Sequence, residues 1–273
     1  MVNKISLAGD LGSGKSTVAK LLIEALGAEY YSTGAIVRAV AEKRGMTVTE
    51  LNVYMETHPE IDKEIDDGLV ALSEDPRPLI IDSRMAWHFT RGTFKVYLST
   101  DAEVASLRIL NAKRVGETTA SLEEQVRQTF LRHESEKKRY SEKYGVDIED
   151  FANYDLVVDT TYATPEQISA CILAAYRLKN EERPFAHAML CPERLSYVDD
   201  AVDAEQIRIL SMKLEVGQAV PEILVAAKQG EFYVKSGLPS ALAYAFNMNA
   251  LVPAVLVPYE EDGKEYVKMK NSF

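Results

Sequence analysis

This chain of 273 residues has few cysteines, fewer basic than acidic residues and no long apolar run. The two cysteines, Cys171 and Cys191, have no partner at metal-ligand spacing, which argues against a disulfide framework or a zinc site. The chain carries 31 basic and 42 acidic residues, and its net charge of −11 argues against a protein that coats nucleic acid or an anionic membrane. No apolar run approaches the ~18 residues of a membrane span or forms a signal peptide. We therefore expect a cytoplasmic protein without nucleic-acid or membrane partners.

The arrangement of apolar runs indicates an α/β fold. Apolar residues make up 47% of the chain, which is enough for a sizeable core. The expected strands are 4–8, 28–32, 79–83, 94–99 and 155–160, and the expected helices are 15–26, 34–44, 59–72, 101–114, 121–143 and 165–179. Strands that alternate with helices form βαβ units. We expect a five-stranded parallel sheet with helices on both faces.

A change of pattern after residue 180 indicates a second domain. The stretch 180–184 is charged and ends in a proline, so it breaks the last helix of the α/β region. Beyond it the expected elements are a helix at 203–214, strands at 222–227 and 231–235, a helix at 239–247 and a strand at 252–257. We therefore divide the chain into an α/β domain, 1–180, and a smaller α+β domain, 181–273.

The strongest motif follows the first strand and opens a helix. It reads Gly-Asp-Leu-Gly-Ser-Gly-Lys-Ser over residues 9–16 and fits the P-loop pattern in the context that pattern requires. Such a loop turns its backbone N–H groups toward phosphate, its lysine reaches the outer phosphates, and its serine ligates Mg²⁺. The alternative is a flexible turn that matches by chance. The ATP-binding residues expected here are Gly9, Gly12, Ser13, Gly14, Lys15, Ser16 and Thr17.

Two further segments place arginines near the expected P-loop. A second strand runs into Thr33 and Gly34, and Arg38 follows one turn into the next helix, where a guanidinium can hold a phosphate in a bidentate pair. Taken alone, such an arginine is more often a surface residue. The third strand ends at Asp82 and Arg84, at the sheet edge where open α/β sheets bind ligands. We expect Asp82 beside Mg²⁺ and Arg84 on a phosphate.

These motifs together resemble the cytidylate kinases and cytidylate-kinase-like P-loop kinases, a nucleoside monophosphate kinase group, over about residues 1–180. The resemblance rests on the P-loop, on Tyr-Tyr-Ser-Thr-Gly-x-Ile-x-Arg at 30–38, and on Ser83-Arg84. It implies an ATP site at the P-loop, Arg38 and Arg84 as ligands of the monophosphate, and a basic helical lid over both.

The lid implied by the resemblance falls on residues 106–143, where basic residues gather. Arg132, Glu136 and Arg139 are spaced to share one helix face and to converge on the transferred phosphate. By the resemblance Arg132 and Arg139 are catalytic with Lys15, Glu136 binds the acceptor, and Arg108 and Arg114 bind ATP. An ordinary solvated helix with internal ion pairs is the alternative.

The base of the acceptor is less well defined by the sequence. Ala35 stands where several relatives carry an acidic residue, and the chain lacks the longer base-binding insert of bacterial cytidylate kinases. Asp62 and Asp66, four residues apart, are candidates for reading the amino group of a base. Acidic residues on an exposed helix face are the commoner explanation of that spacing.

The second domain resembles the ParB and sulfiredoxin superfamily in its strand spacing and in one glycine turn. That turn reads Gly237-Leu-Pro-Ser240, without the polar pair and arginine usual in the group, and residues 181–273 carry a net charge of −5. We expect a non-catalytic accessory domain that serves packing, homo-oligomer formation or a protein partner.

Together these features predict a kinase that uses ATP and Mg²⁺ to phosphorylate a nucleoside monophosphate, with CMP or dCMP as the first candidates. Phosphoryl transfer needs positioning and charge neutralisation, so no general base is required. A kinase of another small metabolite is one alternative. A nucleotide-dependent regulator that acts through residues 181–273 is the other.

Overall fold

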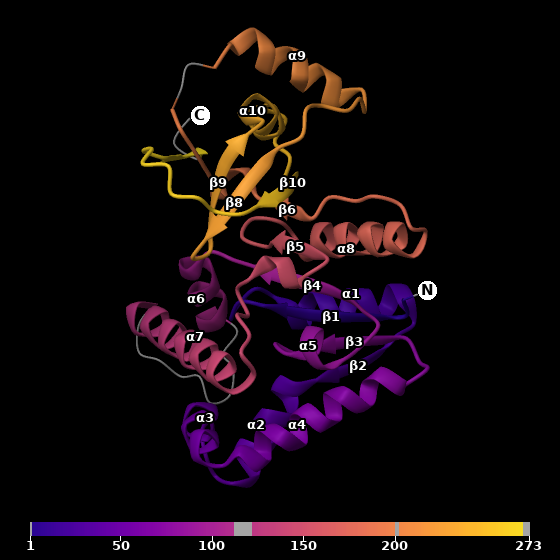
Figure 1. Ribbon diagram of the computed structural model, residues 1–273, viewed down its shortest axis with the longest axis vertical. Helices are drawn as coiled ribbons and strands as arrows, with labels where there is room; N and C mark the ends of the chain where they lie inside the picture. The colour runs from indigo at the N-terminus through magenta and orange to yellow at the C-terminus, as the bar shows by residue number, and fades with distance from the viewer. Residues whose placement is uncertain (1, 112–121, 200–201, 270–273) are drawn as a thin grey trace. The chain divides into compact units, whose positions relative to one another are not determined.

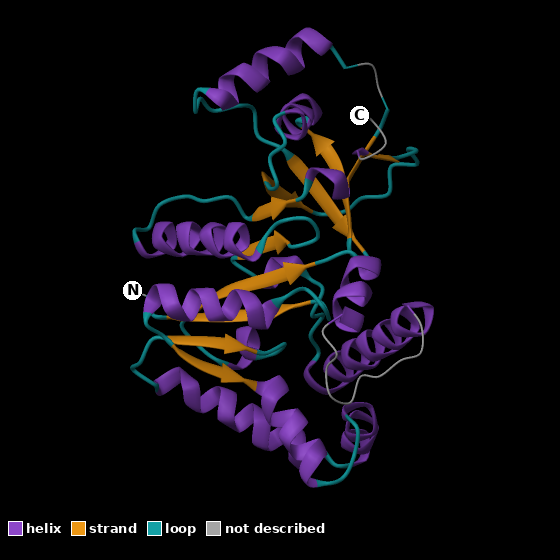
Figure 2. Ribbon diagram, turned by 180° about the vertical axis from the view of Figure 1, so that it is seen from behind, coloured by secondary structure: helices purple, strands orange, loops and turns teal. Residues whose placement is uncertain are grey.

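The computed structural model describes residues 2–111, 122–199 and 202–269 (Figure 1; Figure 2). The chain divides into two compact units, Met1–Asp155 and Leu156–Phe273. Among the described residues no helix is both long enough and apolar enough to cross a bilayer.

Four parallel strands form the sheet of the first unit, in the order β4-β1-β3-β2. They are β1 (Lys4–Gly9), β2 (Glu29–Ser32), β3 (Leu79–Asp82) and β4 (Thr93–Ser99). All six residues of β1 are buried, as expected for a central strand that is covered on both faces. Leu7 of β1 pairs with Asp82 of β3 and with Val96 of β4, so the strands end at one common edge. The strands predicted at these positions are confirmed.

Helices of the first unit follow its strands, as βαβ units require. They are α1 (Lys15–Leu26), α2 (Thr33–Lys43), α3 (Val48–Thr57), α4 (Pro59–Ala71), α5 (Ala86–Phe89), α6 (Ala102–Asn111) and α7 (Leu122–Tyr144), with 3₁₀ turns η1 (Leu72–Glu74) and η2 (Phe151–Asn153). Helices α3, α6 and α7 lie beyond the carboxyl ends of these strands (Figure 1; Figure 2). The arrowheads in Figure 2 mark those ends. The predicted helix 101–114 agrees with α6 as far as residue 111, and 112–114 lie outside the described residues.

Helix α3 was not predicted, although its start is encoded locally. The Thr47 hydroxyl accepts from the backbone N–H of Glu50, and the Glu50 carboxylate accepts from the backbone N–H of Thr47, which is a capping box. Behind α2, α3 and α4 a small core of Leu51, Met55, Ile61 and Ala41 fixes these helices against one another. This core positions the wall of the cavity described below.

The second unit has its own strands, in the order β11-β7-β9-β8-β10-β6-β5. They are β5 (Leu156–Asp159), β6 (Ala188–Leu190), β7 (Leu195–Tyr197), β8 (Leu224–Lys228), β9 (Glu231–Ser236), β10 (Val252–Val257) and β11 (Val267–Lys268). Parallel and antiparallel pairs alternate along this order, so the unit is mixed. Its helices are α8 (Pro165–Asn180), α9 (Ala204–Glu215), α10 (Leu238–Phe246) and the 3₁₀ turn η3 (Pro192–Arg194).

Packing divides the chain earlier than its composition does. Strand β5 pairs in parallel with β6, and α8 contacts β5, so β5 and α8 belong with the second unit although both lie before residue 181. Strands β6, β7 and β11, which have only two or three residues each, were not predicted. The division of the chain into domains at residue 180, and the ParB-like character of 181–273, stay predictions.

Candidate active site

The turn after β1 has the backbone shape that the P-loop motif predicts. Gly9 has φ +136° and Gly12 has φ +76°, both in the region that favours glycine. A Cβ at Gly9 would lie 2.2 Å from the carbonyl oxygen of Leu98, and one at Gly12 would lie 2.5 Å from that of Ala105. The loop therefore requires glycine at both positions for its curvature and its packing. Gly14, also left-handed, caps the N-terminus of α1 and so aims the helix N-terminus at the loop.

Lys15, the first residue of α1, folds back over this loop. Its Nζ donates to the carbonyl oxygen of Gly9 at 2.9 Å and to that of Asp10 at 2.6 Å. Burial, and then the charge of Arg84, lower the pKa of Lys15 to about 8. A phosphate would remove this desolvation penalty, because it supplies the negative charge that carbonyl oxygens only approximate.

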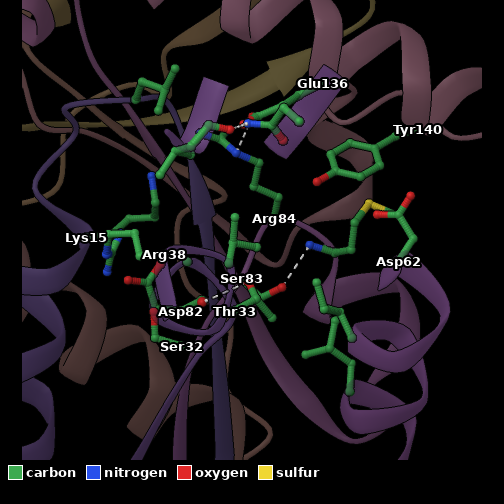
Figure 3. Close-up of a pocket in the computed structure, with 18 of the residues that line it drawn as sticks. Lys15, Ser32, Thr33, Arg38, Asp62, Asp82, Ser83, Arg84, Glu136 and Tyr140 are labelled. Carbon is green, nitrogen blue, oxygen red and sulfur yellow. Dashed lines mark hydrogen bonds and ion pairs between the residues drawn. The ribbon is translucent and has the colours of Figure 1, made fainter. Parts of the chain in front are cut away.

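Arg84 meets Lys15 at the same carbonyl group. Its Nη1 donates to the Gly9 oxygen at 3.0 Å, and its Nε forms an ion pair with Glu136 of α7 (Figure 3). Glu136 is 5% exposed, so the pair is buried and shielded from solvent. Two cations therefore converge at the mouth of the P-loop, and α7 holds one of them in place.

A cavity of about 450 Å³ extends from this point. It brings together most residues that the sequence singled out, namely Gly12, Gly14, Lys15, Ser16, Thr33, Gly34, Arg38, Asp82, Arg84, Glu136 and Arg139. In Figure 3, Lys15, Arg38 and Asp82 lie on one side of the cavity, and Tyr140 and Asp62 lie on the other. The cavity can thus accommodate an elongated ligand with an anionic end.

Some predicted residues do not line this cavity. Gly9, Ser13, Thr17 and Arg108 are described but fall outside its lining. Gly9 and Ser13 shape the loop, since the Ser13 hydroxyl donates to the Asp10 carbonyl oxygen, and the Arg108 guanidinium donates to the Thr100 hydroxyl at 3.4 Å. Arg114 lies outside the described residues, and so does the side chain of Arg132, although Arg132 belongs to α7.

Oxygen donors suited to a magnesium ion flank the P-loop. The exposed Ser16 hydroxyl and the Asp82 carboxylate both line the cavity. Asp82 Oδ2 accepts from the Tyr30 hydroxyl at 2.9 Å, which orients the carboxylate. A serine hydroxyl and one carboxylate, with water and phosphate oxygens, fit the hard ligand set that Mg²⁺ prefers beside a nucleotide. Within the described residues no cluster of three or more His, Cys, Asp or Glu forms an all-protein metal site.

Arg139 of α7 presents an unsatisfied donor near the cavity. Its Nε is buried and has no hydrogen-bond partner among the described residues. Its Nη2 donates to the Tyr140 hydroxyl at 3.4 Å, and the guanidinium lies 5.2 Å from the centre of that ring. A buried guanidinium with an unused N–H is costly by about 1–3 kcal/mol, which an anionic ligand would remove. Arg139, which lines the cavity, is therefore a candidate ligand for an anion.

The far part of the cavity has an apolar wall that the sequence did not predict. Val37, Val48, Met55, Ile65 and Leu69, from α2, α3 and α4, form it. The rest of the cavity lining includes Leu11, Ser32, Asn52, Ser83, Met85 and Tyr140. The helical spacing of these residues was available as a sequence pattern, but a buried core reads the same way. Only the fold shows that this side faces a cavity.

Asp62 and Asp66 lie within this apolar part rather than on a solvated face. Both line the cavity, and Asp62 is 7% exposed. Lys143 Nζ lies 3.1 Å from Asp62 Oδ2, and the Tyr144 hydroxyl donates to Asp66 Oδ2. The exposed-face explanation of their spacing is therefore wrong, and two carboxylates face a space of mixed apolar and polar character.

Known proteins match the first part of the chain. The family model of the cytidylate kinase-like family matches residues 4–162. A cytidylate kinase of Archaeoglobus fulgidus is 36% identical over 177 residues, which cover 64% of this chain and 96% of that protein. An S-adenosylmethionine-dependent nucleotide dehydratase of Lacinutrix mariniflava is 37% identical over 181 residues, which cover 66% of this chain and 37% of that protein. A solved shikimate kinase of Bacteroides thetaiotaomicron matches 66% of this chain and 99% of its own chain, at 17% identity and a TM-score of 0.46.

Proposed function

Since the chain belongs to the cytidylate kinase-like family, we propose that it transfers the γ-phosphoryl group of ATP to a nucleoside monophosphate, with CMP or dCMP as the acceptor. The family supports a nucleotide kinase activity in general. The proposal that CMP or dCMP is the acceptor rests on one cavity. It joins the Lys15 and Arg84 cations at the P-loop to a partly apolar space with two carboxylates.

The proposed chemistry is an in-line displacement. A phosphate oxygen of the acceptor attacks the γ-phosphorus, the bond to the β-phosphate oxygen breaks, and ADP leaves. The attacking phosphate is already ionised near neutral pH, so no general base is needed. Lys15 holds the outer phosphates of ATP, and Arg38 and Arg84 hold the acceptor phosphate. Arg139 neutralises charge that develops on the transferred group, as its unsatisfied Nε supports.

Mg²⁺ fits this proposal at Ser16 and Asp82, whose oxygens line the cavity. When bound, the ion neutralises the β- and γ-phosphate oxygens of ATP. Tyr30 supports that role because it holds the Asp82 carboxylate in one orientation.

The acceptor base is assigned by hydrogen-bonding type. Carboxylates accept hydrogen bonds and donate none when ionised, so Asp62 and Asp66 favour a base with an exocyclic amino group. Cytosine has such a group, whereas uracil presents a carbonyl oxygen at that position and would be repelled. The apolar wall of α2, α3 and α4 supports a ring in the same space.

For the region after residue 180 we propose a non-catalytic accessory role. The turn at Gly237 packs tightly, because a Cβ there would lie 2.3 Å from the carbonyl oxygen of Glu222, and Ser240 is buried. A turn that is occupied by the protein's own backbone offers little room for a ligand. This supports packing, self-association or a protein partner as its use.

The proposal is tested by an assay that couples ADP release to a panel of CMP, dCMP, UMP, AMP and GMP. CMP and dCMP are expected to be turned over fastest. Replacing Arg38 with alanine should lower kcat/KM for CMP roughly 10- to 150-fold, because hydrogen bonds to charged groups contribute ~1.5–3 kcal/mol. Arg91→Ala is the matched control, since the Arg91 side chain is 82% exposed and its ion pair among the described residues is with Glu74 at the surface. A folded, ATP-binding protein that phosphorylates none of the five would refute the proposal.

A further inference from the structure

The last two residues of α7 hold the acidic pair of α4. Lys143 Nζ lies 3.1 Å from Asp62 Oδ2, and the hydroxyl of Tyr144 donates to Asp66 Oδ2. In each carboxylate Oδ2 is therefore engaged, whereas neither Oδ1 forms a hydrogen bond or ion pair within the part of the chain that the structure describes. Each carboxylate thus keeps one oxygen for a ligand in the cavity.

Tyr144 is fixed in position by its neighbours. Its ring meets Phe89 edge-on with centroids 5.2 Å apart, and it lies 6.3 Å from His88 and 6.2 Å from Tyr140. The ammonium of Lys143 lies 5.2 Å from the centre of the same ring. A ring packed on several sides has few other rotamers, so the hydroxyl is aimed at Asp66 before any ligand arrives.

These contacts also affect the charge of Asp66. Burial raises the pKa of Asp66, and the neighbouring Asp62 and Asp67 carboxylates raise it further. The Tyr144 hydroxyl and the Lys143 ammonium oppose this effect and lower the pKa. If either partner is lost, Asp66 takes up a proton at a higher pH, gains an O–H donor and becomes a weaker acceptor.

We propose that Lys143 and Tyr144 are positioning residues that hold Asp62 and Asp66 as hydrogen-bond acceptors for the amino group of the acceptor base, and that they thereby set the preference for cytosine over uracil. This inference rests on the proposed nucleoside monophosphate kinase function. It assigns a second task to α7, whose Glu136 pairs with Arg84 beside the P-loop.

The test compares Tyr144→Phe and Lys143→Met with wild type in steady-state kinetics. Both variants should raise KM for CMP roughly 10-fold, which corresponds to the loss of about one hydrogen bond, and leave KM for ATP unchanged. Their preference for CMP over UMP should fall by a similar factor. Lys138→Met is the control on the same helix, because Lys138 is 75% exposed and pairs with Glu142 at 3.8 Å.

The pH profile separates positioning from mere support of the fold. The acid limb of kcat/KM for CMP should move to higher pH in both variants, because Asp66 accepts more strongly when it is ionised and its pKa has risen. Thermal melting shows whether each variant is folded at assay temperature. Variants that lose kcat while the CMP to UMP ratio and the acid limb stay as in wild type would overturn the inference. A wild-type protein that phosphorylates no monophosphate would instead overturn the proposed function.

Discussion

Replacing Lys15 with methionine separates the contribution of this lysine to binding from its effect on stability. The Lys15 ammonium is buried beside Arg84, and its hydrogen bonds to the Gly9 and Asp10 carbonyl oxygens do not restore its ordinary pKa of 10.5. The folded protein therefore carries an ammonium in a place that disfavours the charge. Methionine has a similar length and no charge, so it removes this penalty along with phosphate binding.

The magnitude follows from the lowered pKa. A pKa of about 8 in the folded state against 10.5 in the unfolded chain means that the unfolded chain binds more protons between these values. Stability of the wild type then rises with pH through that window, relative to a variant without the group. One pKa unit corresponds to 1.36 kcal/mol. The unfolding free energy of wild type, minus that of Lys15→Met, should therefore rise by about 2 kcal/mol between pH 7 and pH 9.5.

The measurement is urea unfolding of both proteins at pH 7, 8, 9 and 9.5. Other groups titrate in this range too, but they are common to both proteins and cancel in the difference. ATP turnover of Lys15→Met should be lost at every pH. If the difference in unfolding free energy between wild type and Lys15→Met stays constant across the four pH values, Lys15 is not held in a disfavoured charge state. Proton uptake on binding of an ATP analogue near pH 8.5, measured in buffers of different ionisation enthalpy, should be seen in wild type and be absent in the variant.

Two further predictions concern the loop and the second unit. Gly12→Ala should abolish ATP binding and destabilise the fold by about 1–3 kcal/mol, because the φ of +76° at Gly12 and the nearby Ala105 carbonyl oxygen leave no room for a Cβ. Nucleotide titration and urea unfolding measure the two effects, and a variant that binds ATP with wild-type affinity would contradict the prediction. Arg194→Met should cost about 3–5 kcal/mol, because Arg194 is 6% exposed, lies 3.5 Å from the fully buried Asp159 and donates to the Gly230 carbonyl oxygen. Kinase constants per folded molecule should stay as in wild type, and a changed KM for CMP would argue against a non-catalytic second region.

The sequence predicted the α/β framework well, because its strands are short apolar runs that periodicity detects. The P-loop followed from one contiguous motif, and the family followed from that motif together with residues 30–38 and Ser83-Arg84. Helix α3 was missed because its capping box at Thr47 and Glu50 opens a segment of only ten residues with a weak apolar pattern. Strands β6, β7 and β11 were missed because two or three residues carry no periodicity.

The site was predictable only where residues act close to a motif. Lys15, Arg38 and Arg84 follow directly from turns after strands, so the sequence could locate them at one edge of the sheet. The pairing of Arg84 with Glu136 depends on where α7 packs, and spacing along α7 cannot supply that position. Tyr144 had no sequence signal, since its partner Asp66 lies 78 positions earlier in the chain.

The pairing of β5 with β6 bears on how this protein can be dissected. Val157 and Val158 of β5 pair with Ala188 and Met189, and the Val157 amide donates to the carbonyl oxygen of His187. The family match, which ends at residue 162, includes β5, but the partner strand of β5 comes from beyond residue 180. A truncation at 180 would strip β5 of that ladder and expose an apolar edge prone to aggregation. The kinase-like region and the segment after it are therefore not separable by cutting, and point substitutions are the sound way to assign their roles.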